Sequence, residues 1–262
     1  TYYLVDGEGW INASDLSTTD NRIESVQKVL NEKYNNQERI SVYVKQLDTN
    51  RVAAINDEKS MYAASVAKLG VLYYAQERLS QEKLALSDEY QYTSAVNGFP
   101  GAYDPDGSGK ISKMPDDKNY SLENLLKAVA QNSDNVATNI LGYYVTNQYG
   151  KAFQKSVDKA AATSWNMDKK ELTARAAGTL MEAVYRQNGD IINYLSSTDY
   201  DGERISKNID VPVAHKIGDA YDFKHDVAIV YADSPFILSI FTDKEGYDKI
   251  TSIADDVYGI LK

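Results

Sequence analysis

The chain contains no cysteine and only two histidines, His215 and His225, among its 262 residues. The lack of cysteine excludes disulfide bonds, thiolate metal sites and a cysteine nucleophile. Two histidines are too few for a histidine-rich metal site, so we expect neither a metal ion nor another cofactor. The missing cysteine does not by itself identify the cellular compartment.

Positive charge is also scarce, because 28 lysine and arginine residues stand against 38 aspartate and glutamate residues. The net charge of −10 argues against binding to the phosphate backbone of a nucleic acid. No apolar run reaches the roughly 18 residues of a membrane span, so membrane attachment would need a segment outside these residues. We expect a globular monomer with one domain or two interleaved lobes.

Residues 1–18 are predicted to form a separate N-terminal arm. Two apolar runs, 2–5 and 9–11, flank an Asp6-Gly7 turn signal, which is typical of a hairpin. The run 9–16 resembles the closing strand of a bacterial SH3-like module, and a simple arm is the alternative. Residues 17–20 then form a polar linker.

The remaining pattern predicts an α+β fold over residues 19–262. Strands are expected at 40–44 and 52–55, and again at 211–216, 227–231 and 236–241. Helices are expected from Ser121, at 135–144, 151–160 and 172–187, and at about 246–260. We predict an antiparallel five-stranded sheet flanked by helices, with a sheet lobe at about 19–62 and 197–262 and an all-helical lobe at about 63–196.

One apolar helix, residues 62–72, carries the polar pair Ser65 and Lys68. A helix that is apolar all round is normally buried, and a buried lysine has a lowered pKa. Residues three apart share a helix face, so an amine that can act as a base lies beside a hydroxyl. Three other Ser-x-x-Lys sequences lie in charged helices, and only this one is predicted to be buried.

Two further motifs follow in the chain, Ser133-Asp134-Asn135 before a helix and Lys216-Ile217-Gly218 at the end of a strand. Each could be structural on its own, as a helix cap and a strand end. Ser-x-x-Lys, Ser-Asp-Asn and Lys-Thr-Gly together mark class A β-lactamases and penicillin-binding proteins. The chain resembles this penicillin-recognising serine enzyme family over roughly residues 20–262.

The resemblance implies a role for each residue of the motifs. Ser65 would attack a carbonyl group, Lys68 would be its base, and Ser133 would pass a proton to the leaving nitrogen. Lys216 would add positive potential near Ser133. The substrate-binding residues would be Asn135, Ile217, Gly218 and Asp219, with the backbone N–H groups of Ser65 and Asp219 forming an oxyanion hole.

The chain departs from this family at two places. Ile217 replaces the threonine or serine of the third motif, so a hydroxyl that helps to bind the substrate carboxylate is missing. Asn166 follows Trp165 where class A β-lactamases have the glutamate that activates the deacylating water. Asp168 or Glu171 could replace that glutamate; otherwise they are solvated carboxylates, and an acyl-enzyme formed with a β-lactam would persist.

Three other features of the sequence allow more than one interpretation. Residues 104–112 resemble an EF-hand loop but lack its final glutamate, because Pro115 stands at position 12, so an Asp/Gly turn is favoured over calcium binding. His215 either tunes Lys216 or is a structural strand residue. Phe99 and Tyr103 are candidates for the wall of the cleft.

We therefore expect a serine acyl-enzyme hydrolase or transferase that acts on a cell-wall peptide amide or a β-lactam and deacylates β-lactams weakly. One alternative is a class A β-lactamase. Another is a non-catalytic member that binds peptidoglycan or a protein. The expected location is extracellular or associated with a bacterial cell wall.

Overall fold

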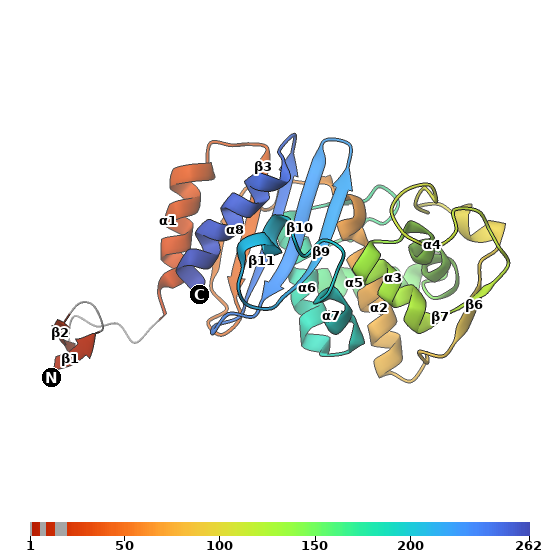
Figure 1. Cartoon of the computed structure of the whole chain (residues 1–262), viewed down its shortest axis with the longest axis horizontal. Helices are drawn as coiled ribbons and strands as arrows, with labels where there is room; N and C mark the ends of the chain where they lie inside the picture. Colours follow the sequence, from red (N-terminus) through yellow and green to blue (C-terminus); the bar gives the residue numbers. More distant parts are fainter. Residues whose placement is uncertain (1, 6–8, 14–19) are drawn as a thin grey trace.

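A single antiparallel sheet joins the two ends of the chain in the computed structural model, which describes residues 2–5, 9–13 and 20–262 (Figure 1). Strands β3 and β11 pair along their length, so an early strand lies beside a late one. This confirms the predicted α+β class and the five-stranded sheet. The strand order is β4 (Val52–Ile55), β3 (Ile40–Gln46), β11 (Phe236–Asp243), β10 (Phe223–Val230) and β9 (Val213–Ala220).

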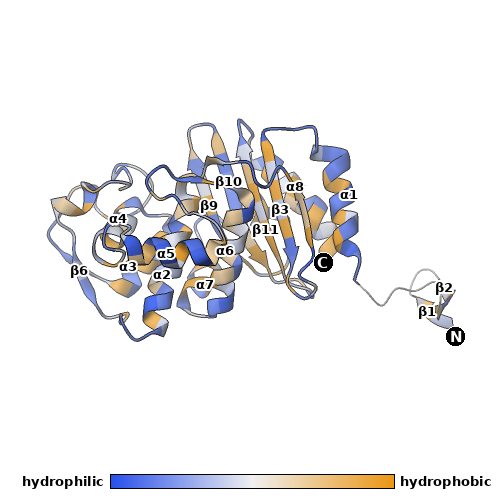
Figure 2. Ribbon diagram, turned by 180° about the vertical axis from the view of Figure 1, so that it is seen from behind, coloured by the Kyte–Doolittle hydropathy of each residue, from blue (hydrophilic) through white to orange (hydrophobic). Residues whose placement is uncertain are grey.

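Both faces of the sheet are buried, because helices cover each of them. Val42 and Val44 of β3 pack into a core with α1 (Arg22–Tyr34) and α8 (Tyr247–Leu261). Tyr43 points the opposite way, into a second core that includes α6 (Ala174–Gln187). The sheet strands are accordingly among the most hydrophobic segments of the ribbon in Figure 2.

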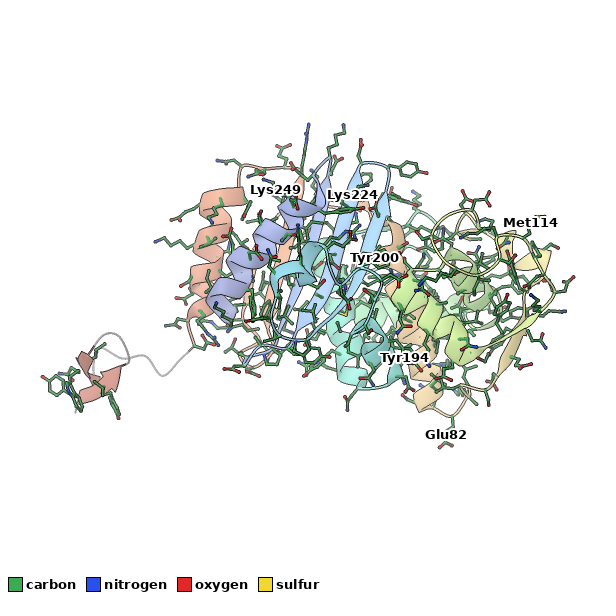
Figure 3. The ribbon with its side chains drawn as sticks, in the orientation of Figure 1. Glu82, Met114, Tyr194, Tyr200, Lys224 and Lys249 are labelled. Atoms are coloured by element: carbon green, nitrogen blue, oxygen red, sulfur yellow. The ribbon has the colours of Figure 1, made fainter. Side chains whose placement is uncertain are left out.

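The second core continues into a helical lobe built around α2 (Leu69–Ser80), whose buried face consists mostly of aliphatic and small residues. Helices α3, α4, α5, α6 and α7 all contact α2. Figure 3 shows Tyr200 between the sheet and this lobe, whereas Met114 lies on an outer loop. The further helices are α3 (Leu122–Asn132), α4 (Asn135–Tyr144), α5 (Lys151–Ala161) and α7 (Asp190–Leu195).

Several short elements complete the fold. Two small antiparallel pairs and two 3₁₀ turns were not predicted from the sequence, because segments of two to five residues carry little periodicity. The pairs are β5 (Met61–Tyr62) with β8 (Glu171–Leu172) and β6 (Glu89–Gln91) with β7 (Asn119–Ser121), and the turns are η3 (Ser94–Asn97) and η4 (Arg204–Asn208).

Of the helices in the described part of the chain, none is long and apolar enough to cross a membrane.

The expected helix starts are confirmed where capping side chains mark them. The Ser121 side chain accepts a hydrogen bond from the N–H of Asn124, and the Asp134 side chain accepts one from Ala137. The segment with Ser65 differs from the expected regular helix, because it begins as a 3₁₀ turn, η2 (Ala64–Lys68), before α2. Ala64 has a φ of 48°, a left-handed conformation that is uncommon outside glycine.

The N-terminal residues form the predicted hairpin, in which β1 (Tyr2–Val5) pairs with β2 (Gly9–Asn12). The expected Asp6-Gly7 turn and most of the polar linker lie outside the described residues. The resemblance of residues 9–16 to an SH3-like strand and the lobe boundaries stay predictions.

Gly178 tests how closely α6 packs on the sheet. A Cβ atom there would lie 2.6 Å from Cδ1 of Tyr43 and 3.3 Å from Cγ2 of Ile237, whereas one at Gly259 of α8 would meet no atom within 4 Å. We expect Gly178→Ala to lower the free energy of unfolding by about 1–3 kcal/mol through overpacking. Gly259→Ala should raise it by about 0.5–1 kcal/mol through helix propensity. Urea unfolding measures both, and a shift in the same direction for both variants would contradict the packing described.

Candidate active site

The turn with Ser65 is fixed through its backbone. The N–H of Ala63 donates to the carbonyl oxygen of Lys170 at 2.6 Å, and the Tyr103 hydroxyl donates to the carbonyl oxygen of Ala64 at 3.2 Å. These two bonds hold the residues just before Ser65, and the unusual backbone at Ala64 is kept in place by them. Ser65 is 7% exposed and lines a cavity of about 200 Å³ together with Tyr103 and Asn135.

Lys68 is completely buried directly behind this cavity. Its Nζ donates to the carbonyl oxygen of Ser133 at 2.6 Å and to Oδ1 of Asn135 at 2.5 Å, and it lies 3.4 Å from Oγ of Ser133. Burial lowers the pKa of Lys68 well below its usual value, and the positive charge of Lys216 lowers it further. The amine is therefore suited to accept a proton. Its hydrogen bonds go to the second motif and not to Ser65.

Ser133 stands between two lysines. It ends α3 in the left-handed conformation, with a φ of 54°, which turns its side chain toward Lys68 and Lys216. Its Oγ accepts a hydrogen bond from Nζ of Lys216 at 2.8 Å. Because the lysine donates in this bond, the hydroxyl proton of Ser133 can be given elsewhere. Burial lowers the pKa of Lys216 to about 7.

Asn135 is engaged on both sides of its amide. Oδ1 accepts from Lys68, and Nδ2 donates to the carbonyl oxygen of Asp104 at 2.7 Å. The amide thus connects Lys68 to the loop around Asp104. Its expected role in binding a substrate amide stays a prediction, because such a substrate would compete with Asp104 for Nδ2.

The third motif needs glycine for a physical reason. A Cβ atom at Gly218 would lie 2.6 Å from the carbonyl oxygen of Ala63 and 3.0 Å from Cγ2 of Val66. Only glycine lets β9 approach the Ser65 turn so closely. This approach brings the backbone of Asp219 next to the turn, where the oxyanion hole is expected.

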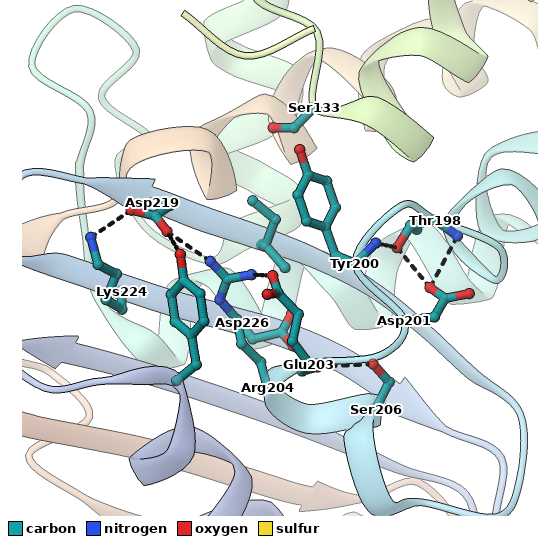
Figure 4. A network of polar contacts seen from close by, with 12 residues as sticks. Ser133, Thr198, Tyr200, Asp201, Glu203, Arg204, Ser206, Asp219, Lys224 and Asp226 are labelled. Atoms are coloured by element: carbon teal, nitrogen blue, oxygen red, sulfur yellow. Dashed lines mark hydrogen bonds and ion pairs between the residues drawn. The ribbon is translucent and has the colours of Figure 1, made fainter.

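Ile217 faces a second cavity, of about 590 Å³, beside the first. Buried Arg204 lines it, and its guanidinium group forms ion pairs with Glu203 and, at 2.9 Å, with Asp219 (Figure 4). The Asp219 carboxylate also accepts from Lys224 at 2.5 Å and from the Tyr247 hydroxyl. The side chain that replaces the family's hydroxyl thus adds only apolar surface to this wall.

Comparison with known proteins identifies this arrangement. Residues 21–261 match the β-lactamase enzyme family. The chain belongs to that family. It is a β-lactamase-like serine hydrolase, and the predicted resemblance to the penicillin-recognising serine enzyme family is confirmed. No curated protein matches the chain.

Solved structures of β-lactamase-family proteins share the fold. PBP-A has 15% identity and a TM-score of 0.73, with 92% of this chain and 95% of PBP-A covered. The TLA-1 extended-spectrum β-lactamase has 20% identity and a TM-score of 0.71, covering 94% and 99%. The β-lactamase from Sphaerobacter thermophilus DSM 20745 has 15% identity and a TM-score of 0.70, covering 91% and 94%. At these identities the likeness concerns the fold.

The loop that follows Trp165 corresponds to the one in which class A β-lactamases are expected to carry their glutamate. Trp165 is buried against Gly70 of α2, and Asn166 accepts a hydrogen bond from the backbone N–H of Lys169. Asp168 and Glu171 are both exposed, and neither lines the cavity in front of Ser65. No carboxylate of this loop therefore faces that cavity among the described residues.

The sequence analysis missed one residue of this loop, Lys170, which is only 6% exposed. Its Nζ donates to the carbonyl oxygens of Gly101 and Met167 and lies 4.4 Å from the centre of the Tyr103 ring. Tyr103 does form part of the cleft wall, as considered above, whereas Phe99 packs against Tyr149 in the core. The adjacent pair Lys169-Lys170 gave no signal that one of the two is buried.

The two histidines have opposite environments. Burial alone would lower the pKa of His215, but Asp226 at 3.0 Å and Asp201 at 3.1 Å outweigh burial and raise that pKa to about 9. Burial lowers the pKa of His225 to about 4; its ring stacks on Phe241. His215 is thus a charged strand residue next to Lys216, and its predicted structural role fits these contacts.

These environments predict opposite effects of pH on stability. The His215 pKa is raised above the unfolded value of about 6.5, so its contribution is complete below pH 6.5 and lost as the pH rises through about 9. The His225 pKa is lowered, so its contribution is present above pH 6.5 and lost as the pH falls through about 4. Imidazole ¹⁵N spectra should show one charged and one neutral ring at pH 7. Two midpoints near 6.5 would contradict this assignment.

Proposed function

We propose that this protein is a serine acyl-enzyme hydrolase or transferase that acts on a cell-wall peptide amide or a β-lactam and releases the β-lactam acyl group slowly. The observation that carries the proposal is the buried Lys68 amine, held by Ser133 and Asn135 behind the Ser65 cavity. A buried primary amine with a lowered pKa, three residues along the chain from Ser65, can serve as the base for nucleophilic attack.

Acylation follows from these positions. Oγ of Ser65 attacks the carbonyl carbon while its proton passes to neutral Lys68, and the carbonyl oxygen gains negative charge at the expected oxyanion hole. The carbon–nitrogen bond then breaks, and the nitrogen takes a proton from Ser133. Lys68 returns a proton to Ser133 across the 3.4 Å that separates Nζ from Oγ. The products of acylation are therefore an ester on Ser65 and the amine formed from the leaving nitrogen.

Deacylation by water lacks a base from the loop where class A β-lactamases carry their glutamate. Asp168 and Glu171 are exposed and lie outside the cavity lining, and Tyr103 forms part of that lining. Two other carboxylates line the cavity, but Asp219 is ion-paired with Arg204 and Lys224, and Oδ1 of Asp104 accepts a hydrogen bond from the N–H of Asp106. An acyl group on Ser65 therefore persists until a suitable acceptor enters. This supports penicillin-binding behaviour over β-lactam hydrolysis.

The acyl donor is proposed from chemistry and from the comparisons. A variant of PBP-A, a protein with the same fold, has been solved as an acyl-enzyme complex with penicillin G. Ile217 removes one hydroxyl that could bind a substrate carboxylate, a loss of about 1–3 kcal/mol if the group is buried. A peptide amide of the cell wall would place the protein outside the cell or at the cell wall, and we propose that location.

Intact-protein mass spectrometry after incubation with a penicillin tests the proposal. We expect an adduct of the mass of the penicillin that persists for many minutes, because the carboxylates of Asp168 and Glu171 lie outside the cavity lining and cannot activate water there. The Ser65→Ala variant should form none, because it lacks the nucleophile. A chromogenic cephalosporin assayed in parallel should show at most a single turnover.

Other outcomes would select the alternatives. Rapid multiple turnover of the cephalosporin, dependent on Ser65, would make the protein a β-lactamase. An equal adduct on wild type and Ser65→Ala would contradict the assigned nucleophile. Failure of both penicillin and a small activated thioester to label Ser65, with binding to peptidoglycan retained, would support a binding role.

A further inference from the structure

Tyr103 lies close to two lysine side chains. Its ring centre is 4.5 Å from Nζ of Lys68 and 4.4 Å from Nζ of Lys170. These distances place the side-chain nitrogen of each lysine in contact with the ring. The two nitrogen atoms therefore lie at most 8.9 Å apart, the sum of the two distances.

The ring is held rigidly in this position. Asn139 of α4 accepts from the N–H of Tyr103 at 2.7 Å and donates to its carbonyl oxygen at 2.8 Å. The Tyr103 hydroxyl donates to Ala64, next to the nucleophile. With main chain and hydroxyl both fixed, Tyr103 keeps its distance to each lysine.

Lys170 has several polar partners that favour its charged form. Two carbonyl oxygens, of Gly101 and Met167, accept from its Nζ, and its own carbonyl oxygen holds Ala63. Burial lowers the pKa of Lys170, and the nearby carboxylate of Asp168 offsets part of that effect. Lys68 is more deeply buried, so of the two lysines it is the one expected to lose its proton first.

We propose that Lys170 is a positioning residue that acts across the Tyr103 ring. Its positive charge disfavours protonation of Lys68 and so keeps the Lys68 amine available as a base. This inference rests on the proposed function, in which Lys68 takes the proton of Ser65. The chain thus has a buried cation in the loop of Asn166, the residue that stands where class A β-lactamases have their glutamate. The cation favours acylation and supplies no base for water.

The other charges around Lys68 come from three further segments. Lys216 of β9 and Lys113 of the loop before β7 act in the same direction as Lys170, and Asp134 at the start of α4 opposes them. Two unit charges up to 8.9 Å apart, at an effective dielectric constant of about 20, shift a proton equilibrium by about one pH unit. The effect of Lys170 is large enough to measure against this background.

The test compares Lys170→Met, Lys170→Arg and the exposed neighbour Lys169→Met with wild type. The rate of Ser65 acylation by a penicillin is measured from pH 5 to 9 by mass spectrometry. We expect the acid limb of the pH–rate profile to lie about one pH unit higher in Lys170→Met than in wild type. At a pH below this limb, acylation of the variant should be about tenfold slower. Lys170→Arg and Lys169→Met should keep the wild-type limb. An unmoved limb in Lys170→Met would overturn the inference.

A second measurement does not depend on catalysis. The ¹³Cε signal of Lys68 in ¹³C-lysine-labelled protein, assigned from its loss in Lys68→Arg, reports the Lys68 titration directly. An upward shift of the Lys68 titration midpoint in folded Lys170→Met, and not in Lys169→Met, supports the inference. It does so even if no penicillin reacts with the protein, and in that case only the proposed function fails. A Lys68 midpoint unchanged in Lys170→Met overturns the inference whatever the acylation rate.

Discussion

A fully buried primary amine such as Lys68 needs hydrogen-bond acceptors around it, and burial makes it lose its positive charge readily. The need for these acceptors constrains the rest of the site. The acceptors of Lys68 are Ser133 and Asn135, which come from the junction between α3 and α4. That junction must therefore stay against the turn that carries Ser65. The left-handed backbone at Ser133 and the capping carboxylate of Asp134 fix its shape.

The remaining parts of the site close around this amine. Gly218 allows β9 to approach the Ser65 turn and brings Lys216 to Ser133. Tyr103 contacts the amine from another side, with Lys170 beyond the ring. Two further lysines and the Tyr103 ring therefore lie around the amine, and we propose that this arrangement favours attack by Ser65 over activation of water.

Much of this could be predicted from the sequence, because the strong signals are local. The strands, the caps at Ser121 and Asp134 and the apolar segment around Lys68 each depend on neighbouring residues. Burial of Lys170, with Lys169 exposed, depends on the left-handed backbone at Lys170, where φ is 54°, and on a hydrogen bond to the carbonyl oxygen of Gly101 in a distant loop. Such contacts between separate segments leave no periodic pattern, which is also why the engagement of Asn135 by Asp104 was missed.

The central claim is that Lys68 makes Ser65 nucleophilic, and it can be tested without knowledge of the substrate. The measurement is the rate at which a fluorophosphonate labels Ser65 as a function of pH, in wild type and in Lys68→Met, with the labelled residue located by peptide mapping. The account predicts labelling at Ser65 that reaches half its maximal rate at a pH well below the ordinary lysine pKa of about 10.4. It also predicts loss of that labelling in Lys68→Met. Labelling of a folded Lys68→Met variant as fast as wild type would contradict it.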